Sequence, residues 1–153
     1  MVALTNDPRF LTGIVPAANT VTTAWELCRF FEVMRCGGEL DGVRVIDTDT
    51  VRRALVERSH LEIDLSLGYP TRFSFGLMLG ARVVSLYGLD TQHAFGHLGF
   101  TNILAWADPE RATSVAVINS GKPIVYPEFY RFLGTMQHIT STMPKVPESE
   151  RML

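Results

Sequence analysis

The sequence has few cysteines, and their spacing excludes the two structures that cysteines commonly support. Its two cysteines are Cys28 and Cys36. On one helix this separation corresponds to roughly 12 Å, which is beyond the reach of a disulfide. No Cys-x-x-Cys pair and no mixed Cys/His spacing typical of zinc occurs. We therefore expect two buried thiols, with neither a disulfide nor structural zinc.

Long apolar runs and basic clusters are also missing. No run approaches the roughly 20 apolar residues of a membrane-spanning helix, and the N-terminus has neither the charged nor the apolar region of a signal peptide. The formal net charge is -2, and basic residues are scattered singly or in pairs such as Arg52 and Arg53. From the chain itself we expect no membrane span, no nucleic-acid partner and a cytoplasmic location.

The short motifs that would supply a complete catalytic machinery are absent as well. The sequence contains no Ser-x-x-Lys, in which one helical turn places an amine beside a hydroxyl, and no Gly-x-Ser-x-Gly. It also lacks His-Glu-x-x-His, a glycine-rich phosphate loop and a distinctive pair of carboxylates. No cofactor is implied, and the residues alone do not make an active site.

What is present is the composition of one globular domain, or of a large piece of one. The chain has 153 residues, of which 46% are hydrophobic and 20% charged. The first 21 residues lack a sustained period, and we expect them to be irregular. A helix is predicted from the capping box Thr23–Glu26 to the stop at Gly37 and Gly38, and a second helix from Asp47 to about Arg58. A loop is expected over 59–71.

Short strands dominate the remainder. Alternating apolar residues predict a strand over 73–79, and further strands are expected over 93–97, 103–107 and 113–118, with residues 82–86 extending the pairing. Links of hairpin length favour antiparallel pairing. A final helix is predicted from Tyr126, and Thr140–Leu153 should form a frayed tail. This order of elements predicts an α+β domain with helices packed on an antiparallel sheet.

His97 is the best single candidate for a functional side chain. It ends a strand-like run and lies between Gly96 and Gly99, which should leave its ring accessible to a substrate. The alternative is a structural histidine at a strand end. A metal pair with His93, four residues earlier on the same side of a strand, is also conceivable, but no third ligand is evident.

Two groups of segments stand in a fixed order along the chain. The first group consists of Pro16–Asn19, Thr23–Phe30 and Gly37–Ile46, and the second of Phe95–Gly99, Trp106–Arg111 and Val117–Pro123. Together they resemble serine hydrolases related to class C β-lactamases, especially the bacterial esterase and lipase-like branch, and the likeness covers roughly residues 16–135. Two groups in the right order are far more specific than either alone.

The resemblance implies a β-lactamase/transpeptidase-like fold, present here as a partial domain. Residues 1–70 would be the end of the helical region, 71–140 the C-terminal sheet and helix, and 141–153 a flexible tail. His97-Leu98-Gly99 would replace the Lys-Thr-Gly of β-lactamases on the strand that edges the active site. The resemblance assigns His97 to substrate contact or the proton network, and the backbone amide of Phe100, after Gly99, to the oxyanion hole.

The sequence also departs from the family pattern. The nucleophile and lysine of Ser-x-x-Lys and the tyrosine of Tyr-x-Asn would lie upstream of this part, and Asn102 stands where a second glycine is often found. The resemblance therefore implies the C-terminal part of a hydrolase that acts on a small ester, lactam or other amide through an acyl-enzyme and is inactive alone. The alternative is a non-catalytic remnant that binds a ligand or partner. An open sheet edge would favour self-association.

Overall fold

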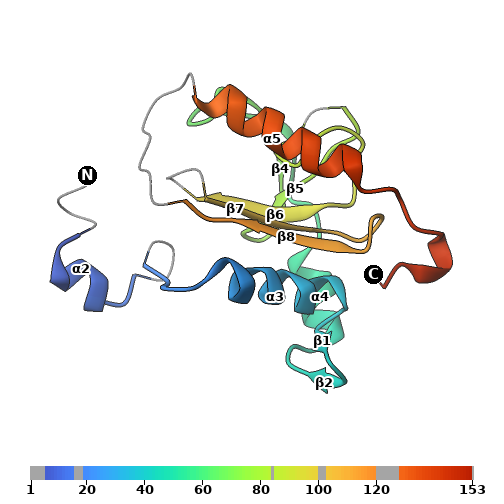
Figure 1. Cartoon of the computed structure of the whole chain (residues 1–153), viewed down its shortest axis with the longest axis horizontal. Helices are drawn as coiled ribbons and strands as arrows, with labels where there is room; N and C mark the ends of the chain where they lie inside the picture. Colours follow the sequence, from blue (N-terminus) through green and yellow to red (C-terminus); the bar gives the residue numbers. More distant parts are fainter. Residues whose placement is uncertain (1–5, 16–18, 84, 100–102, 120–127, 153) are drawn as a thin grey trace.

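Helices cover both faces of an antiparallel sheet in the computed structural model, as Figure 1 shows. The structure describes residues 6–15, 19–83, 85–99, 103–119 and 128–152. The predicted α+β class, with helices packed on an antiparallel sheet, is confirmed. None of the described helices is long and apolar enough to cross a membrane.

The N-terminal third contains helices, and the longest of them lies where the sequence predicts it. Residues expected to be irregular include a short helix, α2 (Pro8–Thr12), because Asp7 caps it by accepting a hydrogen bond from the Arg9 amide. The predicted capping box starts α3 (Ala24–Arg35): the Thr23 hydroxyl accepts from the Glu26 amide, and the Glu26 carboxylate accepts from the Thr23 amide. Both bonds satisfy amides that a helix start otherwise leaves unpaired.

A small hairpin and a second helix follow α3. The hairpin joins β1 (Glu39–Leu40) to β2 (Val43–Arg44) across Asp41 and Gly42, both of which have positive φ. Asp47 caps α4 (Thr48–Ala54) with two hydrogen bonds to backbone amides. The helix ends four residues before the predicted Arg58, because Leu55 already forms its C-cap.

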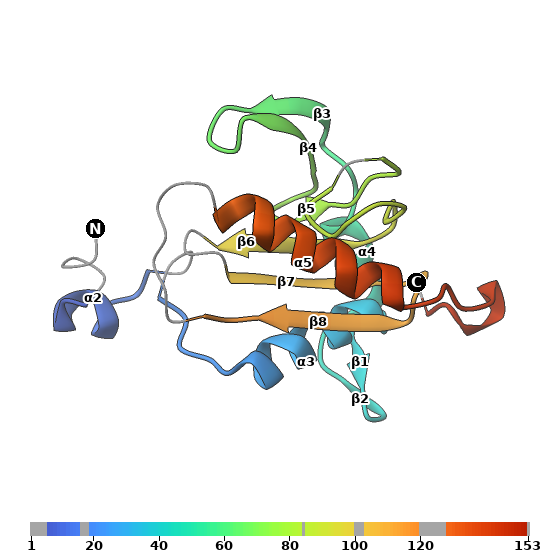
Figure 2. The same ribbon diagram turned by 45° about the horizontal axis from the view of Figure 1, so that its top comes forward.

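Six strands form the main sheet, in the order β3-β4-β5-β6-β7-β8, and every neighbouring pair is antiparallel. Figure 2 shows β6, β7 and β8 side by side beneath α5. The strands are β3 (Ser59–Asp64), β4 (Tyr69–Phe73), β5 (Met78–Leu79), β6 (Phe95–Gly99), β7 (Ile103–Asp108) and β8 (Thr113–Val117). Three of the predicted strands, those over 93–97, 103–107 and 113–118, thus correspond to β6, β7 and β8, with β6 starting two residues later.

The predictions for 59–86 are largely wrong. The expected loop over 59–71 is mostly the β3–β4 hairpin, whose turn is closed by bonds from the Ser66 and Leu67 amides to the Asp64 carboxylate. The expected strand over 73–79 is broken by a second turn, in which Gly76 has a φ of 103°. The described residues between 82 and 86 form a bend and the start of a turn rather than a strand.

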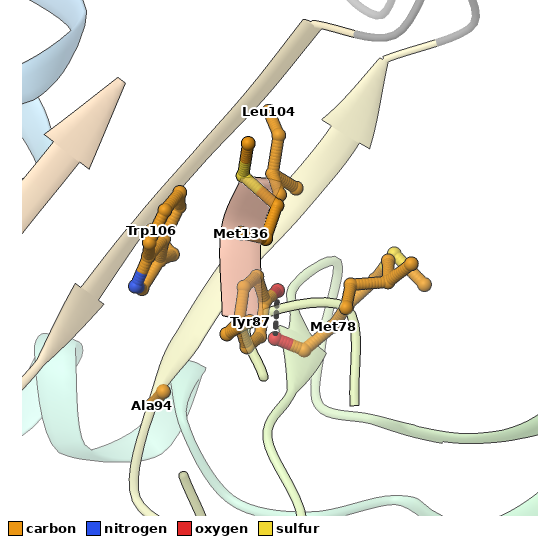
Figure 3. Close-up of a cluster of buried hydrophobic side chains, with 7 residues drawn as sticks. Met78, Tyr87, Ala94, Leu104, Trp106 and Met136 are labelled. Atoms are coloured by element: carbon orange, nitrogen blue, oxygen red, sulfur yellow. Dashed lines mark hydrogen bonds between the residues drawn. The ribbon is translucent and has the colours of Figure 1, made fainter. Parts of the chain in front are cut away.

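The main core lies between the sheet and α5 (Glu128–Thr142). The rings of Tyr87 and Trp106 stack with centroids 5.8 Å apart, and the Tyr87 hydroxyl donates to the Met78 carbonyl, as Figure 3 shows. Met136 of α5 is fully buried against this cluster. The predicted start at Tyr126 lies outside the described residues. The helix continues to Thr142, so the tail does not begin at Thr140.

A second core lies on the opposite face, where α3 and α4 cover the sheet. Phe31, Met34 and Val51 pack there against Phe95 and Ala105 of β6 and β7. The two layers of helix therefore bury alternate residues of the same strands, which is the period expected for a sheet covered on both faces.

A polar network joins α3 to β8. Glu32 accepts hydrogen bonds from the Arg35 guanidinium at 2.5 and 2.9 Å and from the Ser114 hydroxyl at 2.6 Å. Cys28 donates to the Ser114 carbonyl. The two thiols are unpaired, as predicted, but half-buried rather than buried, and burial raises the pKa of Cys28 and of Cys36. Both therefore stay protonated near neutral pH.

Acid should weaken the fold through Glu32. The Arg35 guanidinium, with a smaller contribution from the Ser114 hydroxyl, lowers the pKa of Glu32 from 4.5 to about 2. Because the folded value is the lower one, the charged carboxylate stabilises the fold fully above pH 4.5, and this contribution is lost as the pH falls towards 2. Between pH 7 and pH 3 the free energy of unfolding should fall about 1–2 kcal/mol less in Glu32→Gln than in the native chain.

Urea titrations at the two pH values measure this difference. Glu62→Gln, at an exposed position of β3, is the control and should follow the native chain. Equal acid sensitivity of the native chain and Glu32→Gln would show that this carboxylate does not contribute.

The C-terminal segment returns to the turn between β7 and β8. The Val146 amide donates to the Glu110 carbonyl, and the Glu110 carboxylate pairs with Lys145 at 2.9 Å and Arg151 at 3.3 Å. A short 3-10 helix, η1 (Glu148–Glu150), lies between these two cations. Figure 2 shows this segment beyond the end of the sheet at which β7 ends.

Candidate functional site

His97 lies near the end of β6 with its side chain exposed. It pairs with Ala105, and strand alternation places it on the same face as Phe95, which packs beneath α3 and α4. Helix α3 contacts β7 and β8, further along the sheet. The ring is therefore accessible, as predicted, because the helical layer does not cover this end of β6.

The edge of β6 is open beside His97. Strand β5 pairs only with Phe95 and Gly96, through Leu79 and Met78. On that side His97–Gly99 have no partner strand within the part of the chain that the structure describes. An unpaired stretch of strand can exchange backbone hydrogen bonds with an extended ligand. This open edge results from the shortness of β5.

The two glycines that flank His97 differ in their surroundings. A Cβ on Gly96 would lie 2.1 Å from the Ala105 carbonyl oxygen and 2.6 Å from the Trp106 Cα. Gly96 is thus required for close packing of β6 on β7, and it does not account for the accessibility of His97. A Cβ on Gly99 would lie 3.3 Å from the Ile103 carbonyl oxygen, a much less severe contact.

The His97 ring is held in place through one of its two nitrogens. Its Nδ1 lies 2.8 Å from the Leu98 carbonyl oxygen, which can only accept. In this bond Nδ1 carries the proton, and the neutral ring keeps Nε2 as an acceptor. The Phe73 ring of β4 lies edge-on to His97, with centroids 6.5 Å apart. The arrangement fixes one ring nitrogen and leaves the other for a partner.

Sequence reasoning missed Phe73 as a neighbour of His97. The alternation of apolar residues predicts one strand over 73–79. Such a strand gives no reason to expect the Phe73 ring beside His97. The glycine at 76, with its positive φ, instead turns the chain back after β4. A glycine inside an alternating pattern is the signal that could have revealed the turn.

One of the predicted site residues falls outside the described parts of the chain. This is Phe100, whose amide is the predicted oxyanion donor; Asn102, which departs from the family pattern, lies outside them too. Gly99 is the last described residue before them. His97 and Gly99 are thus the predicted site residues that the structure describes, both on β6.

The described residues offer neither a metal site nor an activated serine. No group of three potential ligands among them could hold a metal ion. His93 precedes β6 rather than lying within it, so the alternation argument that paired it with His97 does not apply. None of the hydrogen bonds of the described serine hydroxyls reaches a histidine ring or a lysine amine. Ser114 donates to the Glu32 carboxylate, and Ser141 donates to the backbone carbonyl of His138.

Comparisons with known proteins connect this arrangement with a family. The family model described as beta-lactamase matches residues 2–129. A curated relative, Esterase/beta-lactamase LipL of Mycobacterium tuberculosis (strain ATCC 25618 / H37Rv), is 27% identical over 139 residues, which are 88% of this chain and 30% of the relative.

Two solved structures are also similar to the chain. A family VIII carboxylesterase superposes with a TM-score of 0.72 at 22% identity, over 91% of this chain and 37% of that one. A penicillin-binding protein homologue from Caulobacter crescentus gives a TM-score of 0.60 at 30% identity, over 73% and 30%. The fold is therefore of the β-lactamase and penicillin-binding protein kind, and the chain spans 30–37% of the length of these relatives.

Proposed function

The chain belongs to the beta-lactamase family, and from this premise we propose that it is the C-terminal part of a serine hydrolase that cleaves carboxylic esters or lactams. The observation that carries the proposal is the His97-Leu98-Gly99 run on an open strand edge, with the His97 side chain exposed. Similarity to an esterase/beta-lactamase and to a carboxylesterase fold favours esters. The nucleophile belongs to a portion outside this sequence, because no Ser-x-x-Lys occurs here.

The proposed reaction proceeds through an acyl-enzyme. The serine oxygen of the complementary portion attacks the ester carbonyl carbon, a base takes its proton, and the carbonyl oxygen becomes an oxyanion. The Phe100 amide, together with the nucleophile's own amide, donates to that oxyanion. The C–O bond then breaks and the alcohol leaves with a proton, after which water hydrolyses the acyl-enzyme by the same steps.

His97 is the proposed contact to the substrate or to the proton network in this reaction. Its Nδ1 is committed to the Leu98 carbonyl, so Nε2 is the atom available to a substrate hydroxyl or to a water. The uncovered end of β6 gives an extended acyl group room beside Gly99. The binding surface and the histidine thus lie on one strand.

Replacing His97 tests this role. In an enzyme that contains this chain and the nucleophile-bearing portion, His97→Asn should lower kcat/KM for a short-chain p-nitrophenyl ester by about tenfold to hundredfold. His138→Asn is the matched control, because His138 is exposed on α5, on the opposite face of the sheet. Equal activity of the two variants would remove His97 from the proposal.

The open edges of the sheet lead to an expectation about the association of the isolated chain. Strands β3 and β8 are the outer strands of the described sheet, and each has one side without a partner strand among the described residues. We therefore expect the isolated chain to self-associate, or to bind a complementary portion, through an open edge. A monomeric preparation at high concentration would contradict this expectation.

A second candidate function is ligand or partner binding without catalysis. It is favoured by the described serine hydroxyls, none of which is hydrogen-bonded to a histidine ring or to a lysine amine. The coding sequence upstream separates the two candidates. Ser-x-x-Lys and the tyrosine motif encoded there would support the hydrolase, and their absence both there and on a partner chain would leave binding alone.

A further inference from the structure

A cleft of about 610 Å³ lies at the end of the sheet where β6 begins, away from Gly99. Its walls come from the end of α4, from β4 and β5, from the segment before β6, from the β7–β8 turn and from the C-terminal segment. This volume is within the range of about 300–1,000 Å³ typical of small-molecule sites. Six separate parts of the chain thus meet around a space large enough for a ligand.

The inner wall of the cleft is apolar. Leu55, Leu79, Ala94 and Phe95 line it, and the last two are almost fully buried. Ala94 and Phe95 belong to the two hydrophobic cores and are held in place by them. A ligand that fills the space therefore buries an apolar group against a preformed wall.

Both guanidinium groups of the cleft are already occupied. Arg72 donates to the Glu57 carboxylate at 2.7 and 2.9 Å and to the carbonyls of Gly80 and Gln92. Arg151 pairs with Glu110 at 3.3 Å and donates to the Val146 carbonyl. Because these donors are engaged within the protein, the cleft offers no free guanidinium to a carboxylate or phosphate.

One carboxylate of the cleft has no partner of opposite charge among the described residues. The cleft is lined by the carboxylates of Glu57, Glu110 and Glu148 and by two guanidiniums, and Lys145 also pairs with Glu110. Glu57 and Glu110 are paired with arginines, but the exposed Glu148 side chain has no hydrogen bond or ion pair within the described residues. The Arg72 guanidinium, with a smaller contribution from His60, lowers the pKa of Glu57 to about 2, so this carboxylate stays charged.

We propose that this cleft binds a small ligand that combines an apolar body with a protonated amine. The apolar group packs against Leu79 and Phe95, and the ammonium group pairs with Glu148 at the rim. His93, exposed beside the wall, offers a further polar contact. The site goes beyond the proposed hydrolase and does not depend on it, because every residue that it uses is in this chain.

Titration of the 153-residue chain with benzylamine, benzyl alcohol and benzoate tests the proposal. These probes share one ring and differ in the charge of the attached group. Benzylamine should bind saturably at one site, and the two others at least fivefold more weakly, as measured by calorimetry. Absence of saturable benzylamine binding, or benzoate binding of equal strength, would overturn the proposal.

Two variants locate the site. Glu148→Gln removes the unpaired charge and should raise the Kd of benzylamine by about threefold to fivefold. Glu150→Gln, also exposed on η1 but outside the cleft lining, is the matched control and should leave Kd unchanged.

Gln92→Lys places a cation at the exposed rim. It should weaken the binding of benzylamine by a similar factor and strengthen the binding of benzoate. If Glu148→Gln has no more effect than Glu150→Gln, or if Gln92→Lys leaves the preference for the amine intact, the amine does not bind in this cleft.

Discussion

Replacing Phe100 with proline should lower kcat by about 100- to 1000-fold in an enzyme that combines this chain with a nucleophile-bearing portion. Proline has no backbone N–H, so the substitution removes the proposed oxyanion donor. Because that hydrogen bond strengthens as the oxyanion forms, kcat should fall while KM changes little. Steady-state hydrolysis of a short-chain p-nitrophenyl ester measures both constants.

Two controls separate the lost donor from other effects of the substitution. Phe100→Leu keeps the amide and should retain activity within a few-fold. Thr101→Pro introduces the same ring one residue later and reports the effect of proline on the backbone. If Phe100→Pro retains full activity, or if all three variants lose activity equally, the Phe100 amide is not the oxyanion donor.

Gly96→Ala should destabilise the chain by at least about 3 kcal/mol. The added methyl group would lie 2.1 Å from the Ala105 carbonyl oxygen and 2.6 Å from the Trp106 Cα. These atoms belong to the backbone of β7 and cannot move aside as a flexible side chain would. Strands β6 and β7 must therefore separate at the centre of the sheet. Urea unfolding followed by tryptophan fluorescence, to which the buried Trp106 and the exposed Trp25 contribute, measures the loss.

Gly134→Ala is the matched control for this substitution. Gly134 lies within α5, and a Cβ built there meets no atom within 4 Å. Alanine has the higher helix propensity, so this variant should gain up to about 1 kcal/mol. Similar destabilisation by both variants would contradict the packing argument for Gly96.

Local signals were sufficient to predict several elements from the sequence. Helix α3 was predicted to within a residue, because a capping box and a glycine pair mark its two ends. Strands β7 and β8 were predicted because each is an apolar run on one side of an Asp-Pro-Glu-Arg turn. In each case the residues that set the boundary are neighbours in the sequence, so no distant contact is needed.

The region 59–79 could not be predicted in the same way. Strand β3 carries Ile63 exposed at 68%, so apolar character and burial do not coincide there. Its turn is closed by the Asp64 side chain, and the later turn depends on the positive φ of Gly76. The residue pattern alone favours a loop where the first turn joins β3 to β4. It favours one continuous strand where the second turn separates β4 from β5.

The candidate site was predictable in part. The exposed position of His97 agrees with the expectation from the residues, and the family was identified from two groups of motifs. The open edge of β6 was not foreseen, because it follows from the two-residue length of β5, which begins only after the turn at Gly76. The nucleophile could not be located, because its motif is absent from these residues.

In the proposed enzyme this chain supplies one wall of the active site, and another portion supplies the nucleophile. Labelling with a serine-directed fluorophosphonate, read by the intact mass of each chain, tests this division of roles. We predict no label on the isolated 153-residue chain and no ester turnover by it. With the nucleophile-bearing portion added, turnover should appear, and the label should fall on the serine of Ser-x-x-Lys. A label on one of this chain's own eight serines, accompanied by turnover that alanine at that serine abolishes, would contradict the account.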